Sequence, residues 1–94
     1  MSRPAALDHS VIDEALADSR WERRGSVLVL ERRFDSFADA LGFVTSVGAL
    51  AERHDHHPDI SLRWTLVTLE LTTHDAGGLS KLDLDLAGAI EQLS

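Results

Sequence analysis

Residues 52–83 read E-R-H-D-H-H-P-D-I-S-L-R-W-T-L-V-T-L-E-L-T-T-H-D-A-G-G-L-S-K-L-D, and this stretch decides how the chain folds. Its centre contains two runs in which apolar and polar residues alternate, the pattern of half-buried strands. The apolar positions are Ile60, Leu62 and Trp64 in the first run and Val67, Leu69 and Leu71 in the second. The phase changes between the runs, so we expect a tight turn near Thr65-Leu66 to join them as a hairpin.

A second pair of strands is expected upstream, over residues 21–24 and 27–34. These runs flank Gly25-Ser26, a two-residue loop with glycine first, which is the composition of a type II′ hairpin turn. One face of the longer strand is apolar and carries Leu28, Leu30 and Phe34, while the other carries Val29, Glu31 and Arg33. This alternation favours an antiparallel sheet with one side on the core.

Three helices are expected around these strands, over residues 8–18, over residues 36–54 and from residue 80 towards the C-terminus. Each has a serine followed three residues later by an aspartate, the spacing of a capping box. The pairs are Ser10 and Asp13, Ser36 and Asp39, and Ser80 and Asp83. The last helix is expected to turn inward its large apolar residues, which are Leu82, Leu86, Ile90 and Leu93.

The middle helix is apolar on two sides, and a helix of this kind must bury both. The first side carries Phe37, Leu41, Val44, Gly48 and Ala51, and the second carries Phe43, Val47 and Leu50. We expect the first side to pack on the sheet. The second is assigned to a partner subunit, the alternative being that the first helix covers it.

The expected order is therefore αββαββα, an α+β fold with a four-stranded antiparallel sheet and helices packed on one face. Residues 1–94 form a single domain, of which residues 1–6 are expected to be a loose tail. The chain has 9 Lys and Arg against 16 Asp and Glu, a net charge of −7, and no cysteine. The charge disfavours nucleic acid and anionic membranes as partners. Without a signal-peptide or membrane-spanning run, we expect a cytoplasmic protein.

Four of the five histidines lie between residues 52 and 83, which points to proton transfer or metal binding there. Pro58 pushes the residue before it towards an extended backbone, so His56 and His57 are expected in a stiff connection after the middle helix. His74 ends the fourth strand. His9 is interpreted as solvated, and His54 as a favourable charge at a helix C-terminus.

A metal site is the competing chemical interpretation of these histidines. Asp55, His56, His57 and Asp59 are candidate ligands. However, the chain has no cysteine and no H-E-x-x-H motif, and structural zinc commonly uses cysteine. We therefore expect no physiological metal and no cofactor.

The spacing of the chemical groups in this stretch resembles the signature of the pterin-4a-carbinolamine dehydratases. The matching residues are Glu52, His56-His57-Pro58, Trp64, His74 and Asp83. Residues 73–80, T-H-D-A-G-G-L-S, strengthen the match, since that family favours T-H-D-A-G-G-L-[ST]. The resemblance runs from about Leu16 to the C-terminus. It implies the same α+β architecture and an assembly of two or four chains.

The resemblance also implies a hydro-lyase that converts 4a-hydroxytetrahydropterin to quinonoid dihydropterin and water, in recycling of the pterin cofactor. His56, His57 and His74 would be catalytic, with His56 and His74 the acid–base pair and His57 also contacting substrate. The substrate-binding residues would be Glu52, Pro58, Trp64 and Asp83.

Structural roles remain open for several of these residues. Glu52 and Asp83 lie near helix ends, where carboxylates are common caps. Trp64 is either a wall of the pocket or part of the core, and Asp75 is expected to bond its own loop. Many relatives have an aromatic residue near the position of Ile60, and Tyr where Trp64 stands, which affects pocket shape. The alternative function is a non-catalytic protein-binding, assembly or transcriptional-dimerisation module of the same fold.

Overall fold

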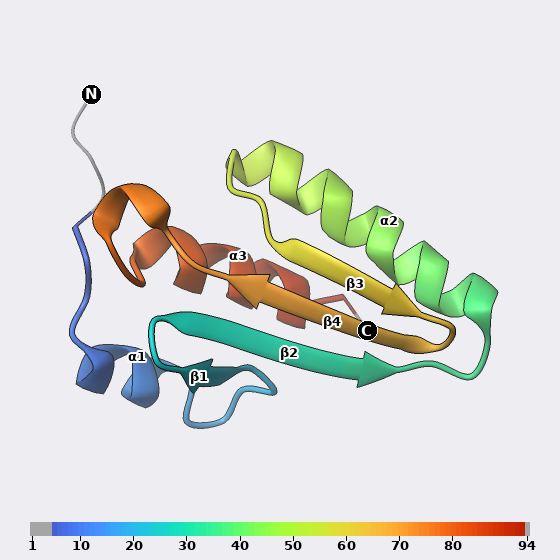
Figure 1. Ribbon diagram of the computed structural model, residues 1–94, viewed down its shortest axis with the longest axis horizontal. Coiled ribbons are helices and arrows are strands. Elements are labelled where there is room, and N and C mark those ends of the chain that lie inside the picture. The colour runs from blue at the N-terminus through green and yellow to red at the C-terminus, as the bar shows by residue number, and fades with distance from the viewer. Residues whose placement is uncertain (1–4, 94) are drawn as a thin grey trace.

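The computed structural model describes residues 5–93. The loose tail expected over residues 1–6 lies mostly outside this range, and its described part, Ala5 and Ala6, belongs to no helix or strand. The elements are α1 (His9–Ala15), β1 (Glu22–Arg24), β2 (Val27–Arg33), α2 (Phe37–His54), β3 (Asp59–Arg63), β4 (Leu66–Leu71), a 3-10 helix (His74–Ala76) and α3 (Lys81–Glu91). The predicted order of helices and strands is confirmed (Figure 1).

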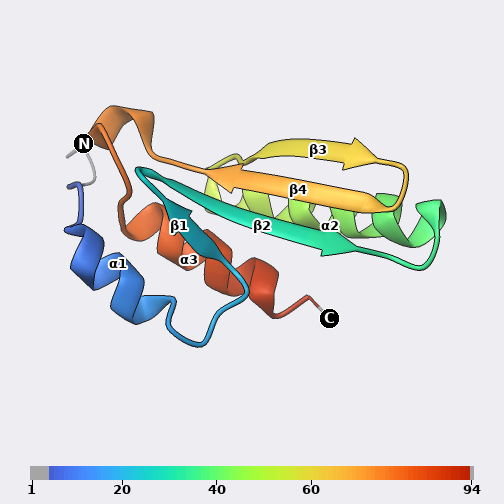
Figure 2. The same ribbon diagram turned by 60° about the horizontal axis from the view of Figure 1, so that its bottom comes forward.

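The four strands form one antiparallel sheet in the order β1-β2-β4-β3. The helices lie on one face of it (Figure 2), as predicted. The first hairpin closes through Gly25-Ser26, because Arg24 pairs with Val27. Gly25 has a φ of 61°, which glycine adopts without steric cost.

The second hairpin turns one residue earlier than predicted, through Trp64-Thr65. Arg63 pairs with Leu66, so Trp64 takes the first turn position with a φ of 55°. The carbonyl of Thr65 accepts a hydrogen bond of 2.8 Å from the backbone N–H of Phe34, which ties the turn to the end of β2. With this register Leu62 lies opposite Val67, which explains the change of apolar phase between the strands.

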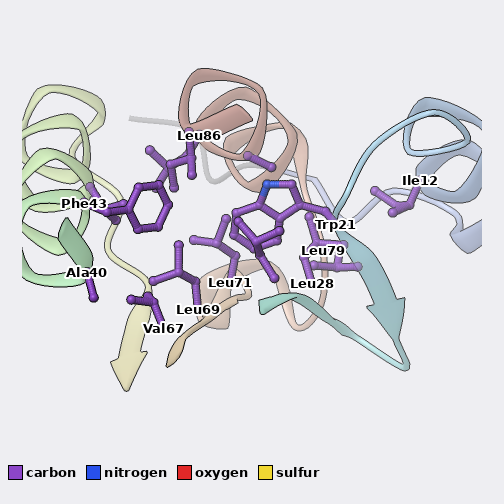
Figure 3. Packing of buried hydrophobic residues seen from close by; sticks show 14 residues of the cluster. Ile12, Trp21, Leu28, Ala40, Phe43, Val67, Leu69, Leu71, Leu79 and Leu86 are labelled. Carbon is purple, nitrogen blue, oxygen red and sulfur yellow. The ribbon is translucent and has the colours of Figure 1, made fainter. Parts of the chain in front are cut away.

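The core lies between the sheet and the helices. Figure 3 shows Phe43 of α2, Leu86 of α3 and Leu69 of β4 in one cluster of buried side chains. Its other members are Ile12, Trp21, Leu28, Leu30, Ala40, Val47, Val67, Leu71, Leu79, Ala87 and Ile90. Leu86 and Ile90 confirm the inward face predicted for the last helix, and Leu93 packs half-buried against the core. Leu82 is half-buried but is not part of this cluster. The burial of apolar surface is the main force that holds the layers together.

The two faces of α2 are largely the reverse of the prediction, although Ala51 of the first face is buried and Val44 packs against the core. Phe43 and Val47, which were assigned to a partner subunit, are buried in the core of the same chain, and Leu50 packs against that core. They are covered by the sheet and α3, not by α1. Phe37 and Leu41, which were expected on the sheet, are instead 49% and 46% exposed. Both stripes are apolar, and only the approach of β4 and α3 decides which of them is buried.

The first helix is shorter than residues 8–18, and its predicted capping box is wrong. The helix begins after Asp8, whose side chain makes no capping hydrogen bond. Asp13 instead accepts two hydrogen bonds from the guanidinium of Arg23, of 2.6 and 2.9 Å. The hydrogen bond from Arg23 lowers the pKa of the Asp13 carboxyl below its ordinary value. The Asp13 carboxylate therefore pairs with Arg23 of β1 and does not cap the N-terminus of α1.

The longest helix, α2, begins as predicted, with the Ser36 hydroxyl accepting from the backbone N–H of Asp39 at 3.0 Å. Among the described residues, no helix combines the length and apolarity needed to span a lipid bilayer.

Candidate active site

The three predicted histidines, His56, His57 and His74, border one cavity of about 330 Å³. Its remaining wall consists of Asp55, Thr72, Thr73, Asp75 and Leu82. The cavity lies where α2 ends and where the chain leaves β4, at the same end of the molecule (Figure 1). Its size falls within the range of small-molecule sites.

The end of α2 brings the two adjacent histidines to this cavity. Asp55 follows the helix in the left-handed conformation, with a φ of 50°. The backbone N–H of His56 bonds the carbonyl of Ala51 at 3.1 Å, and that of Asp55 bonds Glu52 at 3.3 Å. These two bonds form a Schellman motif, which reverses the chain as it leaves a helix. Aspartate is among the few residues other than glycine that adopt this conformation readily.

His56 is held by a buried carboxylate. Its Nε2 lies 2.6 Å from Oδ1 of Asp83, and the two side chains are 11% and 0% exposed. The other carboxylate oxygen, Oδ2, accepts hydrogen bonds from the Thr73 hydroxyl at 2.6 Å and the Ser80 backbone N–H at 2.9 Å. An ionised carboxylate only accepts hydrogen bonds, so Nε2 of His56 carries the proton and Nδ1 is the basic nitrogen.

The same carboxylate caps α3. Asp83 and Ser80 form a reciprocal capping box, as predicted. A buried charge is costly unless hydrogen bonds and nearby dipoles compensate it, and Asp83 has three donors beside a helix N-terminus. Asp83 thus has the structural role considered for it, as a cap of α3, and it also orients His56.

His57 has a looser partner. Its Nε2 lies 3.0 Å from Oε1 of Glu52, which comes from the last turns of α2. The side chains of His57 and Glu52 are 56% and 80% exposed, so solvent screens this pair. Glu52 does not border the cavity. His57 is therefore less constrained by its surroundings than His56, whose partner is buried.

His74 enters from the other side, as the first residue of the 3-10 helix after β4. It is exposed, and within residues 5–93 its imidazole makes no hydrogen bond. Gly77 ends this turn with a φ of 72°, and Thr73 pairs with Gly78, closing the loop. The bond expected from Asp75 to its own loop is not found among the described residues, and its side chain instead borders the cavity.

None of the four predicted substrate-binding residues borders the cavity itself. Glu52 and Asp83 are hydrogen-bonded to histidines that do, whereas Pro58 and Trp64 are not. Pro58 is half-buried after His57 and does not border it. Trp64 is 78% exposed in the turn of the second hairpin, so it is neither core nor a cavity wall in its own chain. Six residue steps along β3 separate it from Pro58, which is about 20 Å at roughly 3.3 Å per residue.

Sequence reasoning missed Thr72, Thr73 and Leu82 as wall residues. Thr73 is 5% exposed and lies in the T-H-D-A-G-G motif, so its position in that motif was the available signal. For the metal hypothesis, residues 5–93 contain no group of three or more His, Cys, Asp or Glu side chains arranged to hold an ion.

A larger hollow, of about 570 Å³, lies beside the start of α2 and is not lined by histidine. Arg32, which lines it, stacks its guanidinium over Phe34 and Phe43 and donates to the carbonyl of Leu93. Its charged group is thus already engaged within the chain. The smaller cavity, with three imidazoles, is the better candidate for chemistry.

Comparison with known proteins identifies the family of this chain. The family model for pterin 4 alpha carbinolamine dehydratase matches residues 5–93. A protein of Roseiflexus sp. (strain RS-1), named "Putative pterin-4-alpha-carbinolamine dehydratase", is 47% identical over 93% of this chain and 95% of its own length. A relative in Thermomicrobium roseum, which bears the same name, is 43% identical over 96% of this chain and 98% of its own length.

Solved structures show the same fold. The transcriptional coactivator/pterin dehydratase of Brucella melitensis superposes with a TM-score of 0.83 at 29% identity, over 92% of this chain and 98% of that one. A pterin dehydratase-like protein that serves as a RuBisCO assembly factor in the alpha-carboxysome superposes with a TM-score of 0.62 at 26% identity, over 77% and 83%. By its sequence along almost its full length, the chain belongs to the pterin 4 alpha carbinolamine dehydratase family.

Proposed function

We propose that this protein is a cytoplasmic hydro-lyase that converts a 4a-hydroxytetrahydropterin to the quinonoid dihydropterin and water, in recycling of the pterin cofactor. The observation that carries the proposal is the convergence of three imidazoles on one cavity, with His56 oriented by the buried Asp83. Membership of the family supports the substrate class.

The reaction needs one proton delivered and one removed. The C4a–O bond breaks as the hydroxyl leaves with an added proton, and the N5–H proton is taken as the C4a=N5 double bond forms. His56 suits the second task, because the carboxylate on Nε2 stabilises the imidazolium that forms when Nδ1 accepts a proton. His74, which has no carboxylate partner among the described residues, would donate the first proton. Imidazoles perform both tasks near neutral pH.

His57 would contact the substrate, with Glu52 setting its orientation and Pro58 the backbone that presents it. Because the Glu52–His57 pair is exposed, we assign it to binding more than to proton transfer. Trp64 lies outside the cavity of its own chain and has no part in this proposal.

The test is the spectrophotometric decay of freshly generated carbinolamine, with and without the protein. We expect decay well above the spontaneous rate. His57→Ala should raise KM with little change in kcat, and His9→Ala, which removes an exposed histidine of α1 outside the cavity, should leave both unchanged. Decay equal to the spontaneous rate would favour the alternative of a protein-binding module. The two structural neighbours, described as a transcriptional coactivator/pterin dehydratase and as a RuBisCO assembly factor, are the reason to keep this alternative.

We further propose that the chain assembles into a homodimer or homotetramer. The exposed apolar side chains of Phe37 and Leu41 on α2, and of Ile60 on the edge strand β3, support this proposal. These side chains replace Phe43, Val47 and Leu50 as the expected contact surface, since the latter belong to the core or pack against it.

A further inference from the structure

Behind His56 lies a chain of hydrogen bonds that the proposed reaction does not use directly. The Thr73 hydroxyl is 2.6 Å from Oδ2 of Asp83, and the Ser80 hydroxyl is 2.8 Å from the Thr73 hydroxyl. Thr73 is 5% exposed, and Ser80 and Asp83 are both 0% exposed. Such a buried network is stabilising only when every polar group in it has a partner.

The directions of these hydrogen bonds follow from the number of protons available. Each hydroxyl has one proton to donate. Thr73 gives its proton to Asp83, so in the 2.8 Å contact Ser80 must be the donor and Thr73 the acceptor. The Ser80 oxygen in turn accepts from the backbone N–H of Leu82 at 3.2 Å. The donors thus run from α3 through Ser80 and Thr73 to Asp83.

We infer that Thr73 is a positioning residue, which acts on His56 through Asp83. Its only hydroxyl proton is committed to the carboxylate, so it has none to offer a substrate in the cavity. Together with the Ser80 backbone N–H it fixes one carboxylate oxygen, and this leaves the other aimed at Nε2 of His56. The orientation and tautomer of the imidazole then depend on a hydroxyl that lies on the far side of Asp83. This inference rests on the proposed function for its kinetic part only.

The experiment compares Thr73→Val, which keeps the shape of the side chain and removes the donor, with Thr73→Ser, which keeps the donor. We expect Thr73→Val to lower kcat by about 10- to 100-fold, the range for losing one hydrogen bond to a charged group, with little change in KM. Thr73→Ser should recover most of kcat. Thr68→Val is the matched control, since Thr68 lies on β4 away from the cavity and should behave as wild type.

A role in loop structure alone would not give this pattern, because the backbone pairing of Thr73 with Gly78 survives all these changes. The decisive readout is therefore the ¹⁵N and ¹H NMR spectrum of the His56 imidazole. In wild type and Thr73→Ser we expect a protonated Nε2 whose proton exchanges slowly with water. In Thr73→Val that exchange should accelerate, and both tautomers should be populated. A folded Thr73→Val protein with wild-type kcat and a wild-type His56 spectrum would overturn the inference.

The NMR readout separates this inference from the proposed reaction. If wild type does not dehydrate the carbinolamine but Thr73→Val still frees the His56 proton, only the reaction is refuted. If Thr73→Val fails to fold, Ser80→Gly takes its place, because glycine at a helix N-cap costs only a few tenths of a kcal/mol. Removing that hydroxyl should change the His56 spectrum in the same direction by a smaller amount, and an unchanged spectrum would refute the network.

Discussion

Replacing Asp83 with asparagine should separate the stability of the fold from the chemistry of the site. Asparagine has nearly the same shape, but it can accept hydrogen bonds at one end only. One end of the Asp83 carboxylate faces the Ser80 backbone N–H and the Thr73 hydroxyl, and the other faces His56. The backbone N–H cannot reverse, so the amide oxygen should take that end and leave the NH₂ group facing His56.

Two consequences follow, of different size. The hydrogen bonds that cap α3 are kept without their charge, so we expect the free energy of unfolding to fall by about 1–2 kcal/mol. His56, however, must now accept at Nε2 and carry its proton on Nδ1. The corresponding Asp→Asn exchange in Ser-His-Asp triads, where the wrong tautomer is stabilised, lowers kcat about 10⁴-fold. We expect a loss of about 10²–10⁴ in kcat for Asp83→Asn, the usual range for one proton-transfer group.

The assay measures carbinolamine decay above the spontaneous rate, denaturant unfolding, and the protonation of the two His56 nitrogens by ¹⁵N NMR. Asp85→Asn is the matched control, because Asp85 is exposed on the same helix and its one ion pair within residues 5–93 is with Lys81. The reasoning is refuted if Asp83→Asn has its imidazole proton moved to Nδ1 and still turns over at the wild-type rate. Unchanged protonation of Nε2 would refute the argument about the tautomer itself.

Four further predictions address the site, the assembly and the surface. His56→Ala and His74→Ala should each lower kcat by about 10²–10⁴, and the double variant should lose much less than the product of the two effects if both act in one step. Exhaustive chelation should leave turnover unchanged, because imidazole proton transfer needs no metal. Light scattering should give a mass at least twice that of one chain, and Leu41→Glu should reduce it by placing a charge on the exposed face of α2. Asp13→Asn should lower stability to denaturant near neutral pH but not well below pH 3.8. The lowered pKa of the Asp13 carboxyl in the folded protein contributes stability at pH values above the ordinary pKa of this group, and the contribution is lost as the pH falls through the pKa of the folded state.

Each of these predictions has an outcome that contradicts it. Wild-type turnover in either histidine variant would remove that residue from the acid–base pair. Activity that is lost to a chelator and restored by zinc or iron would make His56 and His57 metal ligands. A strict monomer at high micromolar concentration would refute the assembly. Equal destabilisation by Asp13→Asn at both pH values would show that the carboxylate charge, and hence the Arg23 ion pair, is not the cause.

The two hairpins could be predicted because their information is local. Alternation over residues 60–71, and a glycine-first loop at Gly25-Ser26, suffice to define antiparallel hairpins. The faces of α2 could not be assigned in the same way. Phe37 and Phe43 are equally apolar, and only contact with distant elements decides that one is half-exposed and the other buried.

The residue types of the candidate site could be predicted from the sequence, but the hydrogen bonds between them could not. The spacing of the histidines indicated that they act together, yet nothing local links His56 to Asp83 across 27 positions. The left-handed conformation of Asp55 is also invisible in the pattern, since glycine is the usual residue at this point of a helix end. Trp64 was misplaced because a strand and a two-residue turn differ there by a single position of register.

The turn at Trp64-Thr65 closes the hairpin of β3 and β4, and the register of this hairpin affects a site that the turn does not touch. His57 precedes β3 and His74 follows β4, so the two sides of the cavity are the open ends of one hairpin. A shift of this register by one residue would slide the strands by about 3.4 Å and turn their side chains to the opposite face. The imidazoles would then lose their common cavity, although no residue near them had changed. The two-residue turn, with Trp64 in the left-handed region at an exposed tip, is thus one of the features that keep β3 and β4 in the register that places the histidines together.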